Sequence, residues 1–101
     1  MKIAVETGTD RISIKLSGQL NTLTSVDFEK EVVNAINSPF LNIVLDCSEL
    51  SYISSAGLRL LLTLYKGQKA KGGTFVLQYV RKEIVDLLKT TGFSSFLVIE
   101  N

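Results

Sequence analysis

Short segments with strand patterns alternate along this chain with longer segments that have the apolar spacing of helices. Residues 2–17 alternate apolar and polar side chains around a turn at residues 8–10, which predicts an antiparallel hairpin with one exposed face. The pattern breaks at residues 18–21, and a capped helix is expected from about residue 24 to residue 37. The chain is therefore predicted to begin in the order β-β-α.

A central strand and a long helix are expected next. Residues 41–45 form an apolar run without alternation, which predicts a strand covered on both faces and ending at Asp46. A helix with a wide stripe of leucines follows from about Ser54 to Lys71, where two glycines end it. The Asp46 to Ser54 segment is thus interpreted as the loop that connects this strand to this helix.

The last third of the chain completes the expected fold. Residues 74–79 are rich in aromatic and β-branched side chains and predict a strand, a short helix is expected around residues 84–88, and residues 96–99 predict an edge strand. The order β-β-α-β-α-β-α-β predicts an α/β fold with a mixed, mostly parallel sheet, an N-terminal antiparallel hairpin and three main helices. A chain of 101 residues is expected to form one domain over residues 1–101.

The amino-acid composition argues against several classes of function. The chain has no histidine and only one cysteine, so a serine nucleophile lacks its usual base and a thiolate metal cage cannot form. No phosphate-binding Gly-x-x-x-x-Gly-Lys motif occurs. We therefore expect no catalytic residue, metal or cofactor, and an intrinsic hydrolase or nucleotide-binding enzyme is the weakest hypothesis.

Charge and hydropathy narrow the range of partners. The chain has 11 basic and 10 acidic residues with no run of like charges, which argues against binding to nucleic acid or to an anionic membrane. Its first residues lack a signal-peptide pattern, and its leucine-rich run is too short and too interrupted to span a membrane. We expect a cytoplasmic protein without direct membrane insertion.

Two adjacent serines, Ser54 and Ser55, stand at the start of the predicted long helix. A helix N-terminus presents unpaired N–H groups and a partial positive charge of about half a unit, so a phosphate on a serine there is tolerated. The same serines, followed by Ala56 and Gly57, also fit an ordinary helix start with a serine cap and a closely packed glycine. The residues alone leave both interpretations open.

Three other positions are candidates for contact with a partner. Asp46 and Ser48 are equally consistent with a turn that satisfies the backbone and with a recognition role. Asn21 follows another expected strand, so its loop can reach the same sheet edge, although a plain loop role is the simpler interpretation.

These segments together resemble the stand-alone STAS domain, the fold of bacterial anti-sigma factor antagonists. Residues Gly18 to Asn21 match the Gly-x-Leu-[Asp/Asn] turn after the second strand, and Asp46-Cys47-Ser48 matches the Asp-x-Ser that ends the third. Residues Ile53 to Leu58 match the phosphorylation loop, and residues Leu87 to Phe93 match the last helix and its exit. The resemblance covers nearly the whole chain.

The resemblance implies a partner-switching protein that is not an enzyme. In that cycle the unphosphorylated antagonist binds an anti-sigma factor that is also a GHKL-type serine kinase, and this frees the sigma factor. The kinase then phosphorylates the antagonist, and a metal-dependent serine phosphatase resets it. The implied acceptor, two residues before the glycine, is Ser55, with Ser54 as the second choice. The implied partner-binding residues are Asn21, Asp46, Ser48, Ser54, Ala56, Gly57, Leu58 and Arg59.

The chain departs from the family pattern at two positions. Many switching members place Asp just before the acceptor and Ser or Thr just after it, whereas this chain has Ser54 and Ala56. Other members are not phosphorylated and serve as scaffold or adaptor subunits of lipid-transport machines or sensory assemblies. A phosphorylation-controlled antagonist is the first hypothesis and a constitutive adaptor is the second.

Overall fold

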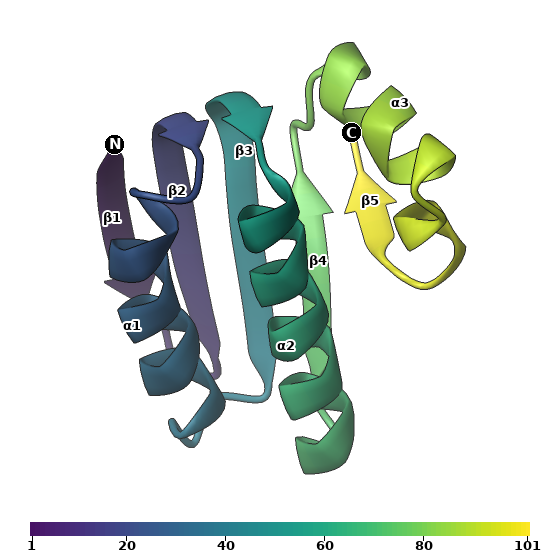
Figure 1. Cartoon of the computed structure of the whole chain (residues 1–101). Coiled ribbons are helices and arrows are strands. Elements are labelled where there is room, and N and C mark those ends of the chain that lie inside the picture. Colours follow the sequence, from purple (N-terminus) through teal and green to yellow (C-terminus); the bar gives the residue numbers. More distant parts are fainter.

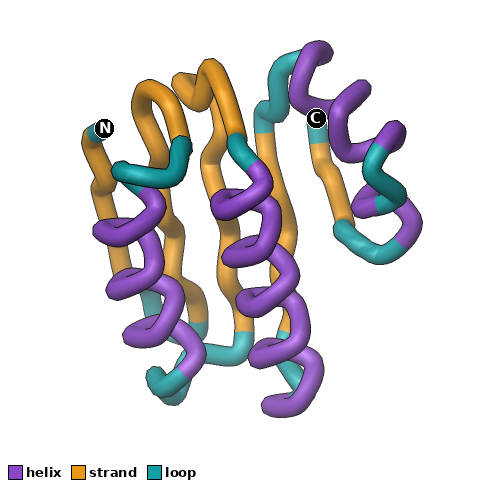
Figure 2. Tube along the Cα trace, viewed as in Figure 1, coloured by secondary structure: helices purple, strands orange, loops and turns teal.

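A computed structural model describes all residues from 1 to 101 and contains a five-stranded sheet with three α-helices (Figures 1 and 2). The order of elements along the chain is the predicted one. The elements are β1 Lys2–Thr7, β2 Arg11–Leu20, α1 Ser25–Ile36, β3 Asn42–Ile53, α2 Ser55–Lys71, β4 Thr74–Gln78, α3 Lys82–Thr90, a 3₁₀ helix Phe93–Ser95 and β5 Val98–Glu100.

The strands lie side by side in the order β1-β2-β3-β4-β5. Strand β1 pairs antiparallel with β2, and each later strand pairs in parallel with the strand before it. The predicted mixed, mostly parallel sheet with an N-terminal hairpin is confirmed. In this topology the parallel strands all end at one edge of the sheet, where loops carry functional groups in folds of this kind.

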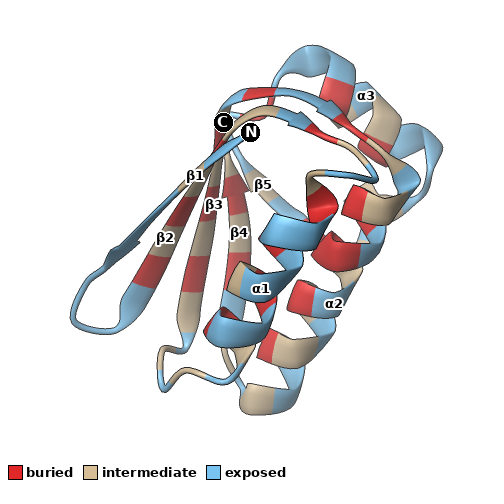
Figure 3. Cartoon of the chain, turned by 60° about the vertical axis from the view of Figure 1, so that its left-hand side comes forward, coloured by how far each residue is buried: buried red, intermediate tan, exposed pale blue.

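Helices α1 and α2 both cover the same face of the sheet, and the other face is uncovered (Figure 3). The prediction that the central strand is covered on both faces was therefore wrong. In β3 burial alternates, because Ile43 and Leu45 are fully buried while Val44 and Asp46 remain partly exposed. The apolar run 41–45 was too short to reveal this period, since Val44 occupies an open-face position.

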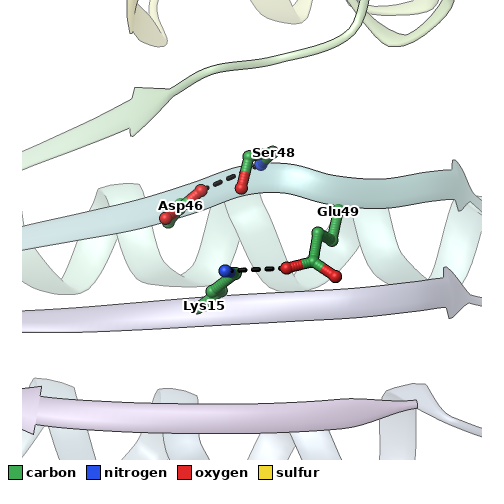
Figure 4. Close-up of polar contacts among 4 residues, drawn as sticks. All are labelled: Lys15, Asp46, Ser48 and Glu49. Carbon is green, nitrogen blue, oxygen red and sulfur yellow. Dashed lines mark hydrogen bonds and ion pairs between the residues drawn. The ribbon is translucent and has the colours of Figure 1, made fainter.

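Strand β3 continues seven residues beyond the predicted end at Asp46. Its pairing with β2 shifts between Lys15↔Asp46 and Ser17↔Glu49, so β3 holds one extra residue there and forms a bulge. Within this bulge the Asp46 carboxylate accepts the N–H of Ser48 at 2.9 Å (Figure 4). Polar residues that suggest a loop therefore remain in the strand.

Strand β2 likewise runs through Gly18 to Leu20, where a pattern break was expected. Gly18 has a φ of 105°, a left-handed conformation that glycine adopts without a steric penalty. A second register shift follows between Gly18 and Gln19, which lets β2 and β3 stay paired to Leu20↔Ile53. The two strands thus end together.

The C-terminal segment was predicted less accurately than the rest. Gly92, with a φ of 83°, follows the end of α3 as expected, but a 3₁₀ helix then occupies Phe93–Ser95. The last strand starts at Val98 rather than at residue 96, and it pairs with β4 at the sheet edge as predicted. Its three residues pair only with Val76–Gln78.

The core lies between the covered face of the sheet and the helices, and the stripe of leucines on α2 faces it as predicted. Cys47 points into this core with no exposed surface, and burial raises the pKa of its thiol to about 12. Such a thiol stays protonated and behaves as a small apolar group.

Lys71, the last residue of α2, forms hydrogen bonds with carbonyls at the end of α1 and just beyond it. Its ammonium donates to the carbonyls of Ala35, Ser38 and Phe40 at 3.2, 3.0 and 2.9 Å. We expect Lys71→Met to lower the free energy of unfolding by about 2 kcal/mol, because these carbonyls lose a charged donor. Urea denaturation measures the change, with the exposed Lys66→Met as the control. Equal effects of the two substitutions would contradict this role.

Candidate functional site

Strands β2 and β3 deliver two polar residues to the same place on the sheet edge. Leu20 pairs with Ile53 at the end of both strands, and the Ser54 N–H donates to the Leu20 carbonyl at 2.8 Å. Asn21 and Ser54 are therefore next to one another, each directly after a strand. The expectation that the loop at Asn21 reaches the edge where the long helix starts is confirmed.

Ser54 is the N-cap of α2. Its hydroxyl oxygen accepts the Gly57 N–H at 3.3 Å, and its carbonyl accepts the Leu58 N–H at 2.9 Å. The residue is half-buried and has an extended backbone, as N-cap residues do. Ser54 is therefore the serine with the structural role of helix cap, which the sequence allowed for one of the two.

Ser55 is the first residue of α2 and is exposed. Its hydroxyl makes no hydrogen bond within the protein, and the N–H groups of Ser55 and Ala56 have no acceptor there. These are the unpaired donors that every helix start leaves. The site therefore combines a free hydroxyl with a local environment that favours an anion.

Gly57 allows the start of α2 to pack closely on the strand ends. A Cβ at this buried position would lie 2.8 Å from side-chain atoms of both Ile53 and Leu20. Leu58 is only 8% exposed and belongs to the core, while Ala56 is half-buried. Gly57 and Leu58 thus hold the helix start in position and offer little surface to a partner.

Asn21 organises the turn before α1. Its side-chain oxygen accepts the N–H groups of Leu23 at 3.0 Å and of Thr24 at 2.9 Å, while its own N–H donates to the Thr24 hydroxyl at 2.9 Å. This reciprocal pair resembles a capping box and fixes the chain between β2 and α1. Asn21 therefore acts locally, and it sets the direction in which the neighbouring Leu23 projects.

Exposed apolar side chains at the sheet edge where β2 and β3 end were missed by the sequence interpretation. Leu23 is 81% exposed, Val26 is 56% exposed, and Tyr52 next to the end of β3 is 50% exposed. A small concavity of about 100 Å³ lies between the starts of α1 and α2, lined by Val26 and Ala56 among others. The available signal was that Leu23 and Val26 fall outside the apolar period of α1. We name Leu23, Val26 and Tyr52 the apolar rim.

Arg59 lies one helical turn after Ser55 and is exposed. It takes part in no ion pair. It lines the same small concavity as Ala56 and Val26. Residues four apart on a helix are neighbours, so the guanidinium is within reach of an anion carried by Ser55.

The structure does not bring Asp46 and Ser48 to this site. They lie within β3 about 20 Å from its end, given a rise of about 3.3 Å per residue. Nearby on the open face, Lys15 and Glu49 form an ion pair of 2.7 Å (Figure 4). The hydrogen bond between them raises the pKa of Lys15 and lowers that of Glu49. The Asp46 contact with the Ser48 N–H fits the backbone-satisfying interpretation of this pair.

No group of three or more His, Cys, Asp or Glu side chains is placed to hold a metal ion. None of the helices has the length and apolar character needed to cross a membrane.

Comparison with known proteins adds the following findings. The family model described as the STAS domain matches residues 2–101. A protein of Bordetella bronchiseptica named "Putative anti-sigma factor antagonist BtrV" is 28% identical over 101 residues, covering 100% of this chain and 87% of the relative.

Solved structures show the same fold. The anti-sigma factor antagonist SpoIIAA in its unphosphorylated form superposes with a TM-score of 0.80 at 19% identity, covering 99% of this chain and 88% of that one. The Bacillus cell fate determinant SpoIIAA in its phosphorylated form gives 0.78 at 19% identity, covering 99% and 92%. At this identity the likeness concerns the fold.

Proposed function

Because the chain belongs to the STAS domain family, we propose that it is an anti-sigma factor antagonist controlled by phosphorylation of Ser55. In its unphosphorylated form it binds an anti-sigma factor that is also a GHKL-type serine kinase, and the sigma factor is released. The kinase phosphorylates Ser55 and thereby loses its hold on the antagonist. A metal-dependent serine phosphatase restores the binding form. The chain itself catalyses nothing in this cycle.

The observation that carries this proposal is the division of roles between the two serines. Ser54 uses its hydroxyl to cap α2, whereas the Ser55 hydroxyl is exposed and unbonded. A kinase can therefore transfer phosphate to Ser55 without breaking the helix cap. A phosphate on Ser54 would instead modify the oxygen that accepts the Gly57 N–H.

A phosphate on Ser55 is compatible with the fold. It would carry a charge of about −1.5 to −2, placed beside two free N–H groups and the positive end of α2. Arg59, one turn away, supplies a further cation. We therefore expect phosphorylation to leave the packing of the domain unchanged and to act only at its surface.

The same phosphate is unfavourable in a bound complex. The apolar rim, Leu23, Val26 and Tyr52, offers exposed apolar surface at the same edge as Ser55. A partner that covers both this rim and the start of α2 would also cover the phosphate, which would lose its water and meet apolar or acidic groups. A loss of only about 1.4 kcal/mol weakens binding tenfold. Local charge is thus sufficient to release the partner.

The comparisons support the proposal in two ways. The Bordetella relative, similar over the full chain, carries the name of an anti-sigma factor antagonist. SpoIIAA, whose fold this chain shares, is described in both unphosphorylated and phosphorylated forms, with nearly equal TM-scores to this chain. Both forms of that protein thus share the fold of this chain.

The test is phosphate transfer from the cognate kinase, identified as the GHKL-type protein that co-purifies with this chain from its native cells. Incubation with that kinase and ATP is expected to add one phosphate to the wild type and to Ser54→Ala, and none to Ser55→Ala. Intact-mass measurement reads the result. Full phosphorylation of Ser55→Ala would disprove the assignment of the acceptor.

A constitutive adaptor is the second candidate function. It is favoured by Ser54 and Ala56, which replace the acidic and hydroxyl residues that flank the acceptor in many switching members. In that case Ser55 is only part of a helix start, and the chain holds a larger complex together. The absence of any added phosphate on the wild type, with a kinase that binds it, would favour the adaptor.

A further inference from the structure

The largest concavity of the molecule lies at the outer edge of β4, far from Ser55 along α2. Its volume is about 380 Å³, compared with 240 Å³ or less for the others, and this falls in the range of small-molecule sites. Its walls come from the second half of α2, the start of β4 and the segment that leads into β5. Nothing in the proposed switch uses this pocket.

The pocket exists because β5 is short. Strand β5 pairs with Val76–Gln78 only, so Thr74 and Phe75 have no strand on their outer side. Figure 1 shows β5 beside the upper part of β4, while the lower part next to α2 is left open. Two residues of free edge are too few to pair with a strand of another chain. The occupant that fits is therefore a small molecule.

One wall of the pocket is aromatic. The rings of Tyr65 and Phe96 are 4.9 Å apart at an angle of 52°, and Phe93 continues the series 5.3 Å from Phe96. Phe75 closes the inner side and is 5% exposed. Flat rings at these spacings favour a planar, apolar ligand body.

Gln68 forms a rigid part of the pocket wall. It is 1% exposed, and its amide nitrogen donates to the carbonyls of Leu41 at 2.9 Å and Thr74 at 3.3 Å, which fixes the orientation of the amide. Its oxygen is buried away from the pocket opening and has no donor. Gln68 therefore shapes the pocket and offers no polar group to a ligand.

The charged residue that lines the pocket favours a negatively charged ligand. Lys69 lines the pocket with its ammonium 5.8 Å from the centre of the Tyr65 ring, and it forms no ion pair. No carboxylate lines the pocket. An anionic group on the ligand would pair with this lysine.

From these features we infer that the pocket binds a small planar aromatic carboxylate. The ring packs against Tyr65 and Phe96, and the carboxylate faces Lys69. The inference does not depend on the proposed switch at Ser55.

The probe for this site is indole-3-acetate, which combines a planar aromatic ring with a carboxylate. Titration of the ¹⁵N-labelled protein is expected to give saturable NMR shifts at the Gln68 side-chain amide and the backbone amides of Gly73 and Val98. A dissociation constant on the order of 1 mM or tighter is expected for a molecule of this size. Tryptophol, which lacks the carboxylate, should bind about threefold more weakly.

A pair of exposed lysines on α2 provides the matched control. Lys69→Met should weaken indole-3-acetate binding about threefold and leave tryptophol binding unchanged, whereas Lys66→Met should alter neither. Absence of saturable shifts at these amides, or equal affinity for indole-3-acetate and tryptophol, would overturn the inference. Shifts of the same amides that depend on protein concentration alone would assign the pocket to a second copy of the chain instead.

Discussion

A Ser55→Asp variant is expected to bind the anti-sigma factor at least tenfold more weakly than the wild type, while the domain itself becomes slightly more stable. The carboxylate would lie beside the apolar rim, where a bound partner must strip its water, and about 1.4 kcal/mol of added cost gives a tenfold loss. In the free protein the same charge occupies the first turn of α2 near Arg59, which is worth about 0.3–1 kcal/mol of stability.

Calorimetric titration measures the binding, and thermal or urea denaturation measures the stability. Thr63→Asp is the matched control, because it adds the same charge to an exposed position of α2 about two turns further on. The control should bind like the wild type. Weaker binding of Ser55→Asp together with unchanged or higher stability would show a surface effect and not misfolding. Binding of Ser55→Asp with wild-type affinity would refute charge-driven release.

The second large effect is expected from Gly73→Ala, which should lower the free energy of unfolding by about 3 kcal/mol or more. A Cβ on Gly73 would overlap the Leu41 carbonyl oxygen and lie 2.8 Å from the amide nitrogen of Gln68. That carbonyl accepts bonds from both Thr74 and Gln68, so it cannot move aside without loss. Backbone displacement of this kind is among the costlier results of adding a methyl group.

Gly8→Ala is the comparison for this prediction. Its added Cβ would meet only the Arg11 carbonyl at 3.7 Å, which is an ordinary contact. Chemical denaturation followed by circular dichroism should therefore show a shift within about 0.5 kcal/mol for Gly8→Ala. Similar midpoints for the two alanine variants would show that the turn between α2 and β4 can relax, contrary to the expectation.

The order of elements and the mixed, mostly parallel sheet could be predicted because most elements have a clear apolar period or an uninterrupted apolar run between turn residues. The length of β3 could not, since its second half contains polar residues that remain in the ladder through two register shifts. A strand that bulges breaks the two-residue period by which strands are recognised. The uncovered face was missed for a related reason: Val44 made an alternating strand look continuously apolar.

The candidate site was located by sequence, but the roles of its residues were not all assigned. Both Ser54 and Ser55 are preferred cap residues, and only the bond from the Gly57 N–H to the Ser54 hydroxyl tells them apart. Asp46 and Ser48 were placed at this edge because the strand was expected to end early. Leu23 and Val26 were passed over, although Leu23 precedes α1 and Val26 lies outside the apolar period of that helix.

The start of α2 acquires its shape only after distant parts of the polypeptide have met. Ser54 is held by the Leu20 carbonyl, and that bond requires β2 and β3 to pair in parallel across the intervening α1. Parallel pairing of this kind forms slowly, because a long crossover must close first. Ser55 therefore stands at a helix end only in the folded domain. An enzyme that recognises this helix end would discriminate against unfolded copies of the chain.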